Sequence, residues 1–159
     1  MSATLALSAF TPALAQGAQI AFGGLKHDSS LPIEITAEQL TIDQSDGSAV
    51  FTGDVLIGQG EMRLSAAKVR VEYVTGEGST GEISRLHATG GVTLVNGAEA
   101  AEAVDAVYTV TSAQVVMTGS VILTQGQNAL SGDRLTVDLT AGTGQMDGRV
   151  KTILQPGGE

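Results

Sequence analysis

The sequence contains no cysteine, which excludes disulfides, thiolate metal ligands and a cysteine nucleophile. It has two histidines, His27 and His87, which are too few for a multi-histidine metal site. Aromatic residues make up 3% of the 159 residues, and positions 33–155 contain no proline. No apolar run reaches the roughly 18 residues that a membrane-spanning helix needs. We therefore expect neither a metal centre nor a transmembrane helix, and no cofactor.

Basic residues are also scarce, since 8 Lys and Arg stand against 17 Asp and Glu for a formal net charge of −9. Proteins that bind the phosphate backbone of nucleic acids usually carry an excess of basic residues, so we expect no nucleic-acid partner. Hydrophobic residues account for 42% of the chain, which excludes a disordered polymer. The length suits one domain.

The N-terminal residues have the composition of an export signal. Residues 1–15 carry no charge and end in Ala13-Leu14-Ala15, the small-x-small pattern that precedes signal-peptidase cleavage. The positively charged start of such a signal is missing, so we expect a signal peptide over 1–15 that is truncated. We expect a flexible lead-in over 16–31, one folded domain over 32–156 and a tail over 157–159.

An internal repeat organises the rest of the chain. One motif, Gly-x-Val-x-(Ile/Leu)-x-(Gln/Asn)-Gly, begins at Gly53, Gly90 and Gly119, and a degenerate copy begins at Gly148. A second motif, which opens with a small residue, begins at Ala37, Ala66 and Gly132, with a weaker copy at Ala103. The steps between the motifs are 13 and 16 residues, apart from one step of 24 that contains the loop-like stretch 75–82. The chain therefore has four repeats of 29 residues.

Within each motif apolar residues alternate with polar ones, which is the period of a β-strand. The parity of the apolar positions changes at Gly60 and again past Ala66, so the strands must bend there. We predict a strand, a corner, a second strand, a corner and a third strand in each repeat. Such a unit cannot bury its apolar face alone and must stack on its copies. The predicted fold is an all-β solenoid or folded-over sheet, with a loosely filled aliphatic interior and unpaired edges at both ends.

The inward-facing apolar positions are the candidate binding residues for alkyl chains. They are Leu40, Ile42, Phe51, Val55, Ile57, Met62, Leu64, Val69, Val71, Val92, Leu94, Met117, Val121, Leu123, Leu135, Val137, Met146 and Val150.

Residues 51–73, 88–97, 117–139 and 144–156, together with 32–43, resemble the OstA-like family of lipopolysaccharide export in Gram-negative bacteria. The chain is most similar to the soluble periplasmic bridge members of the family. The resemblance implies a twisted β-jellyroll, or folded "taco", of about sixteen antiparallel strands. It also implies a periplasmic location, lipid A acyl chains in the groove and copies that join end to end. The implied partners are lipopolysaccharide, an inner-membrane-anchored homologue and an outer-membrane barrel.

Two other classes of function are compatible with parts of this pattern. A structural β-solenoid would assemble through its edge strands without lipid. A polysaccharide-processing enzyme would need one group of acidic residues that is not part of the repeat, and aromatic side chains on which sugar rings can stack. The sequence offers neither, so we expect no enzyme. Lipopolysaccharide is anionic like this chain, so binding would depend on alkyl burial, at about 0.8 kcal/mol per CH₂.

The charged residues and histidines have plainer interpretations than catalysis. Asp43, Glu72 and Asp138 recur with the repeat, so we interpret them as solvated strand-end charges. The basic residues alternate with apolar ones and are expected on the outward face rather than in a phosphate clamp. They include Lys68, Arg70, Arg134, Arg149 and Lys151. We expect surface or local roles for His27 and His87 rather than metal ligation.

Overall fold

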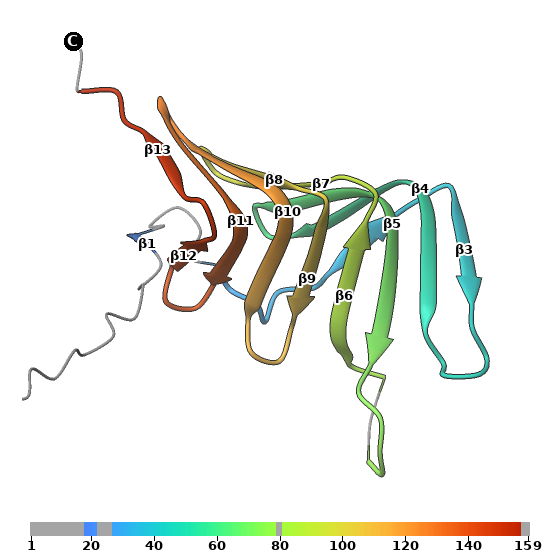
Figure 1. Ribbon diagram of the computed structural model, residues 1–159. Coiled ribbons are helices and arrows are strands. Elements are labelled where there is room, and N and C mark those ends of the chain that lie inside the picture. Colours follow the sequence, from blue (N-terminus) through green and yellow to red (C-terminus); the bar gives the residue numbers. More distant parts are fainter. Residues whose placement is uncertain (1–17, 22–26, 79–80, 157–159) are drawn as a thin grey trace, which may run out of the picture.

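The computed structural model describes residues 18–21, 27–78 and 81–156, and all regular structure in them is β (Figure 1). The strands form one 13-stranded sheet in which every pair is antiparallel. They are β1 (Ala18–Ala21), β2 (Glu34–Thr36), β3 (Gln39–Ile42), β4 (Ala49–Gln59), β5 (Met62–Tyr73), β6 (Ile83–Thr89), β7 (Val92–Asn96), β8 (Glu99–Ala103), β9 (Asp105–Thr109), β10 (Gln114–Gln125), β11 (Asn128–Asp138), β12 (Thr143–Asp147) and β13 (Lys151–Ile153). The all-β, folded-over prediction is confirmed. The predicted signal peptide and tail lie outside the described residues.

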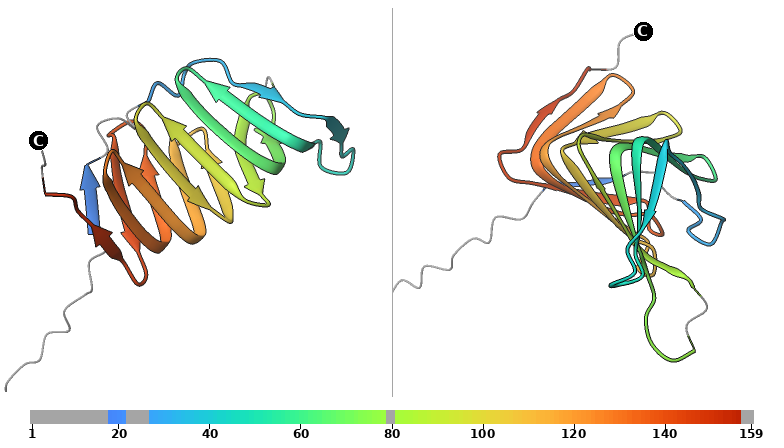
Figure 2. Two further views of the ribbon diagram at one scale, coloured as in Figure 1. Left: turned by 90° about the horizontal axis from the view of Figure 1, so that it is seen from above. Right: turned by 90° about the vertical axis from the view of Figure 1, so that its right-hand side faces the viewer.

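The sheet is folded along its length into two leaves, which meet at an angle in the end-on view of Figure 2. Leaf A contains β3, β6, β9, β12 and β1, and leaf B contains β2, β7, β8 and β13. The long strands β4, β5, β10 and β11 cross from one leaf to the other, so they belong to both. The line along which the leaves join is called the crease.

Each repeat crosses the crease at the first glycine of its Gly-x-Val motif. Gly119 has φ of 88° and Ser120 has φ of 47°, and the β10–β11 register shifts between Thr118 and Val121. Two successive left-handed residues turn the strand, and glycine adopts this conformation at the least cost. A Cβ on Gly119 would also lie 2.7 Å from the Cβ of Val104, which leaves no room for a side chain. The equivalent pairs in the other copies also have positive φ, namely Gly53-Asp54, Gly90-Gly91 and Gly148-Arg149.

The parity change at Gly60 is not a corner, because the chain reverses there in a hairpin between β4 and β5. Gly60 has φ of 56° and the next residue has no positive φ, which is the pattern of a type II′ turn. Each repeat is therefore a bent hairpin rather than three strands and two corners. The described residues form thirteen strands, fewer than the expected sixteen or so. Four strands pass through the crease unbroken, and each of them counts once.

The expected lead-in over 16–31 is not separate from the fold in its described parts. β1 pairs with β12, with Ala18 opposite Met146. The His27 N–H donates to the carbonyl oxygen of Leu139 at 2.8 Å. Residues 27–33 then lead to β2 on the side of the molecule away from the crease (Figure 2). The backbone partners of β1 and His27 lie more than a hundred residues further along the chain, where local periodicity gives no signal.

Candidate functional site

The interior between the leaves is lined by continuous rows of apolar side chains. One row on leaf A passes through successive cross-strand pairs from β3 to β12. Its members are Leu40, Phe51, Val69, Ala88, Ala106, Met117, Leu135 and Met146. A second row, on leaf B, contains Ile35, Ile57, Leu64, Leu94, Ala101, Leu123 and Leu130. Cross-strand neighbours in such rows contact one another directly, so each row is a continuous aliphatic surface.

The structure places fourteen of the eighteen predicted inward residues in the hydrophobic core, each at most 2% exposed. They are Val55, Ile57, Met62, Leu64, Val69, Val71, Val92, Leu94, Met117, Val121, Leu123, Leu135, Val137 and Met146. Phe51 is half-buried and packs against this core. The core is therefore closed at its centre, and the loosely filled interior expected from the sequence is not found there.

The remaining three predicted residues are solvent-exposed, although Leu40 and Ile42 continue the inward rows. Leu40 lies opposite Phe51 and is 52% exposed, and Ile42 lies opposite the buried Ala49 and is 57% exposed. Val150, just before β13, is 39% exposed. β3 is an end strand with no further neighbour to cover it, and β13 is the end strand of leaf B. The apolar interior surface therefore emerges into solvent at the β3 end, and Val150 is exposed at the β13 end.

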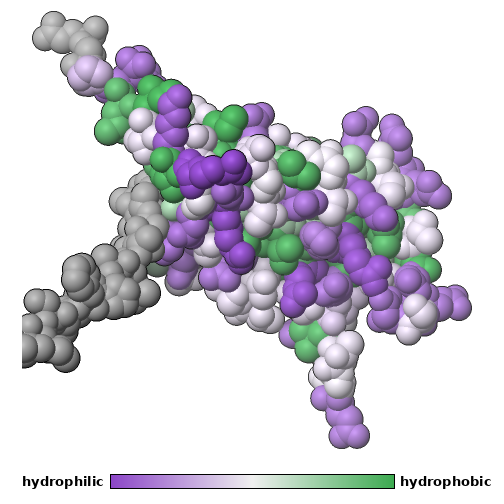
Figure 3. Space-filling model, viewed as in Figure 1, coloured by the Kyte–Doolittle hydropathy of each residue, from purple (hydrophilic) through white to green (hydrophobic). Residues whose placement is uncertain are grey.

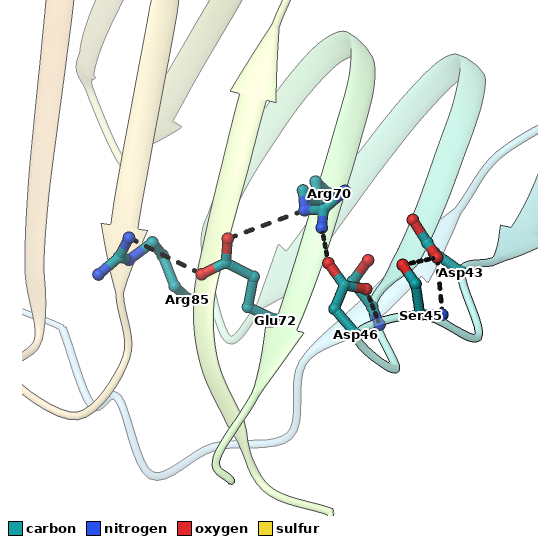
Figure 4. A network of polar contacts seen from close by, with 7 residues as sticks. Asp43, Ser45, Asp46, Arg70, Glu72 and Arg85 are labelled. Atoms are coloured by element: carbon teal, nitrogen blue, oxygen red, sulfur yellow. Dashed lines mark hydrogen bonds and ion pairs between the residues drawn. The ribbon is translucent and has the colours of Figure 1, made fainter.

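Several charged residues on the outer surface pair with one another. Arg70 of β5 contacts Asp46 in the turn before β4, and Glu72 lies 3.8 Å from Arg70 and 3.7 Å from Arg85 of β6 (Figure 4). In the same turn the Ser45 hydroxyl and N–H donate to Asp43, and these bonds hold the pKa of Asp43 below its usual range. The strand-end acids Asp43 and Glu72 thus take part in turn hydrogen bonds and in ion pairs on the outer surface.

Two other predicted strand-end or outward charges have similar roles. Asp138 Oδ1 accepts hydrogen bonds from the backbone N–H groups of Thr140 and Ala141, each at 2.9 Å. Arg149 pairs with Asp133 at 2.9 Å. The view in Figure 3 shows hydrophilic, intermediate and hydrophobic residues intermixed, with one hydrophobic group near β13. No group of three or more His, Asp or Glu side chains suited to a metal ion occurs in the described residues.

Polar residues form one rim of the interior, at the hairpin tips of leaf B. Gln59, Asn96 and Gln125 hold the amide position of the repeat motif, and each ends the inward face of its strand. Gln59 is 1% exposed and Asn96 is 3% exposed. Glu99 lies opposite both Asn96 and Gln125 in the strand register. The sequence already contained this signal, because the amide recurs before the second glycine of each motif.

Gln59 connects three parts of the chain. Its Oε1 accepts a hydrogen bond from the Tyr108 hydroxyl at 3.0 Å and lies 3.1 Å from His27 Nε2. Its Nε2 donates to the carbonyl oxygens of Ser29 at 3.0 Å and Leu31 at 2.8 Å. Burial raises the pKa of Tyr108. The contacts of His27, Gln59 and Tyr108 were not predicted, because they join segments from three distant parts of the sequence.

Comparisons with known proteins agree with this architecture. Residues 34–143 match the family model described as "LptA/(LptD N-terminal domain) LPS transport protein". The chain belongs to this family. The match covers most of the described strands, and it confirms the resemblance stated above to the OstA-like proteins of lipopolysaccharide transport.

One relative by sequence and one solved structure are also similar to the chain. An uncharacterised protein of Rhizobium meliloti (strain 1021) is 33% identical over 152 residues, which cover 91% of this chain and 82% of that protein. The crystal structure of LptH from Pseudomonas aeruginosa superposes with a TM-score of 0.71 at 20% identity, over 81% of this chain and 99% of LptH. LptH is described as the LptA-homologous periplasmic component of the lipopolysaccharide transport device. At this identity the match shows a shared fold. No described segment forms a helix that is long and apolar enough to cross a membrane.

Proposed function

We propose that this chain is a periplasmic lipopolysaccharide-binding transport protein. It shields lipid acyl chains against its inward apolar rows and bridges inner- and outer-membrane export components by end-to-end strand pairing. Its partners in this role are an inner-membrane-anchored homologue, an outer-membrane barrel and further copies of itself. The chain acts by binding rather than by catalysis, in keeping with its family.

The observation that carries the proposal is the way in which the apolar rows reach solvent. They run from strand to strand through the core and emerge at Leu40 and Ile42 at one end. An interior surface that continues to an open end is suited to a ligand that passes from one molecule to the next. A second copy placed end to end would extend the rows without a break.

The strand edges at both ends support end-to-end pairing. β2 and β3 pair only with β4, so each has an unpaired outer edge. At the other end β13 pairs only with β11 in leaf B, and β1 pairs only with β12 in leaf A. Unpaired backbone groups of this kind accept strands from another chain. At this second end, the edge of leaf A that could accept another strand is β1, which comes from the N-terminal part of the chain.

Alkyl burial is the driving force that we assign to lipid binding. The net charge of −9 opposes an anionic headgroup, but that repulsion between exposed charges is screened beyond about 8 Å at physiological salt. Each buried methylene contributes about 0.8 kcal/mol, so several acyl chains outweigh the repulsion if the phosphates stay outside.

A second function, a scaffold that assembles through its edges without lipid, is favoured by one observation. Core residues such as Val69, Met117 and Leu123 are 0% exposed, so the centre of the interior is already filled. A scaffold needs only the edge strands and a stable core.

Native mass spectrometry of the purified protein, with and without lipopolysaccharide, separates the two functions. Ile42→Asp places a charge on the inward row at the open end, where the side chain is 57% exposed, so folding is retained. Ile122→Asp is the matched control, because Ile122 is 45% exposed but lies on the outer face of leaf B. The transport function predicts a lipopolysaccharide adduct that Ile42→Asp weakens and Ile122→Asp leaves unchanged. Lipid-free oligomers with no adduct in any of the three proteins would instead support the scaffold.

A further inference from the structure

The polar rim of leaf B contains the same side-chain type in successive repeats. Gln59 and Asn96 occupy equivalent positions in the repeat motif, each two residues beyond a core residue on the same face, Ile57 or Leu94. Both amides are buried, at 1% and 3% exposure. What one of these positions binds therefore indicates what the other is suited to bind.

In the first repeat the chain itself supplies every partner of the amide. Gln59 Oε1 accepts the Tyr108 hydroxyl, and Gln59 Nε2 donates to the backbone carbonyls of Ser29 and Leu31. Tyr108 is one of only two tyrosines in the chain. The first rim position is thus a satisfied hydroxyl- and carbonyl-binding site.

In the second repeat, the amide nitrogen and a carboxylate oxygen on the opposite residue have no partner. Asn96 Nδ2 is a buried donor without a hydrogen bond, and Glu99 Oε2 is a buried acceptor without one. The other carboxylate oxygen of Glu99 accepts from Gln125 Nε2 at 3.1 Å, which holds the side chain in place. Asn96 and Glu99 lie directly opposite each other in the β7–β8 register. Buried polar groups without partners are rare in folded proteins, and a facing donor and acceptor point to a ligand group that both accepts and donates.

We propose that Asn96 and Glu99 form a hydroxyl-binding site at the mouth of the interior. A ligand hydroxyl accepts from Asn96 Nδ2 and donates to Glu99 Oε2. The next inward residues of these strands, Leu94, Ala101 and Leu123, are each at most 2% exposed, so the attached alkyl chain reaches them only when the two leaves separate at this rim. The ligand is therefore an amphiphile with a hydroxyl close to an alkyl chain.

This inference rests on the proposed lipid-binding function and specifies which part of the lipid is recognised. The hydroxyl has two possible sources, a hydroxyl on the acyl chain or one on the sugar headgroup. An anionic phosphate is a poor ligand for this site, because Glu99 would face it as an acceptor.

Two pairs of probes with the same fourteen-carbon chain test the site by titration calorimetry. The first pair is 3-hydroxytetradecanoic acid and tetradecanoic acid, which differ by one hydroxyl on the chain. The second pair is tetradecyl glucoside and a tetradecyl oligoether with a methyl cap, which differ in headgroup hydroxyls. In the unaltered protein we expect the hydroxylated member of at least one pair to bind about 3- to 10-fold more tightly. Which pair shows the difference identifies the source of the hydroxyl.

Variants then locate the effect. Asn96→Leu and Asn96→Ala both lack Nδ2 and are expected to reduce the ratio within the pair to about 1. Gln127→Leu is the matched control, because it removes an exposed amide from a neighbouring hairpin tip, and it should keep the ratio of the unaltered protein. If all four probes bind with ratios near 1, the hydroxyl site is overturned and the lipid-binding function stands. The hydroxyl site is likewise overturned if Asn96→Leu and Asn96→Ala both retain the ratio. If neither the probes nor lipopolysaccharide bind, the proposed function fails and the site with it.

Discussion

The hydroxyl of Tyr108 donates a hydrogen bond to Oε1 of Gln59 over 3.0 Å and so ties the hairpin tip of leaf B to leaf A. Tyr108 is 1% exposed and Gln59 is 1% exposed, so the bond lies in the protein interior. It closes the side of the molecule opposite the crease, where no backbone ladder joins the two leaves in the described part of the chain.

Removing this hydroxyl should destabilise the fold. Tyr108→Phe is expected to lower the free energy of unfolding by about 0.5–1.5 kcal/mol, the usual net value of one hydrogen bond. Urea denaturation measures the change, with Tyr73→Phe as the control because Tyr73 is 36% exposed. Equal stabilities of the two variants would show that the bond between the leaves contributes nothing.

Burial should also make Tyr108 a source of alkaline sensitivity. The raised pKa of Tyr108 in the folded protein means that the neutral phenol is favoured there. The associated stability is fully present below the unfolded pKa of about 10 and is lost as the pH rises through the higher folded value. In Tyr73→Phe, which leaves Tyr108 as the only tyrosine, absorbance titration should give phenolate formation above pH 10. Ionisation at or below that pH would contradict the burial that the structure assigns to this ring.

The crease should tolerate no side chain on its glycines. Gly119→Ala combines a φ of 88° with a Cβ that would lie 2.7 Å from the Cβ of Val104, so we expect a loss of about 2–4 kcal/mol. Gly126→Ala is the control, because Gly126 has a φ of 59° but no atom within 4 Å of the added Cβ. In Gly126→Ala, the free energy of unfolding should fall by only about 1 kcal/mol, which is the cost of placing alanine in the left-handed conformation. Thermal or urea denaturation compares them, and a larger loss for Gly126→Ala would refute the close approach at the crease.

Adjacent residues of β10 should respond very differently to a charge. Val121 is 0% exposed and Ile122 is 45% exposed. Val121→Asp buries an unpaired carboxylate and should cost about 4 kcal/mol, enough to prevent folding of a marginal domain, whereas Ile122→Asp should change stability by less than about 1 kcal/mol. Circular dichroism and urea titration distinguish the two. Similar behaviour of the pair would mean that the strand register is shifted by one residue.

The turn between β3 and β4 should depend on the ionisation of Asp43. Its pKa is lowered chiefly by the Ser45 hydroxyl and then by the Ser45 N–H, so its contribution to stability is present above the unfolded pKa of about 3.9. That contribution is lost as the pH falls through the lower folded value. Ser45→Ala removes the first of the two bonds and should move the pKa of Asp43 towards its ordinary value, as measured by NMR titration of the side-chain carboxyl. An unchanged pKa would exclude the hydroxyl as the main cause.

Much of the fold could be predicted because each repeat is defined by a pattern among residues that are close together in the chain. The alternation around Val55 and Ile57 identifies strands and their buried faces, and the glycine before each Val marks the crease. Local pattern does not distinguish a reversal from a bend, since both change the parity of apolar positions. The pattern therefore predicts a corner at Gly60, although this residue lies in a hairpin turn.

The sequence by itself determined the all-β class, the 29-residue period and the identity of most core residues, because strand alternation and backbone freedom at glycine are local properties. Only the tertiary structure decided which distant segments meet. β1 pairs with β12, and His27 and Tyr108 converge on Gln59. The exposure of Leu40 and Ile42 also follows from tertiary structure, because a residue on an inward face is buried only where a neighbouring strand covers it.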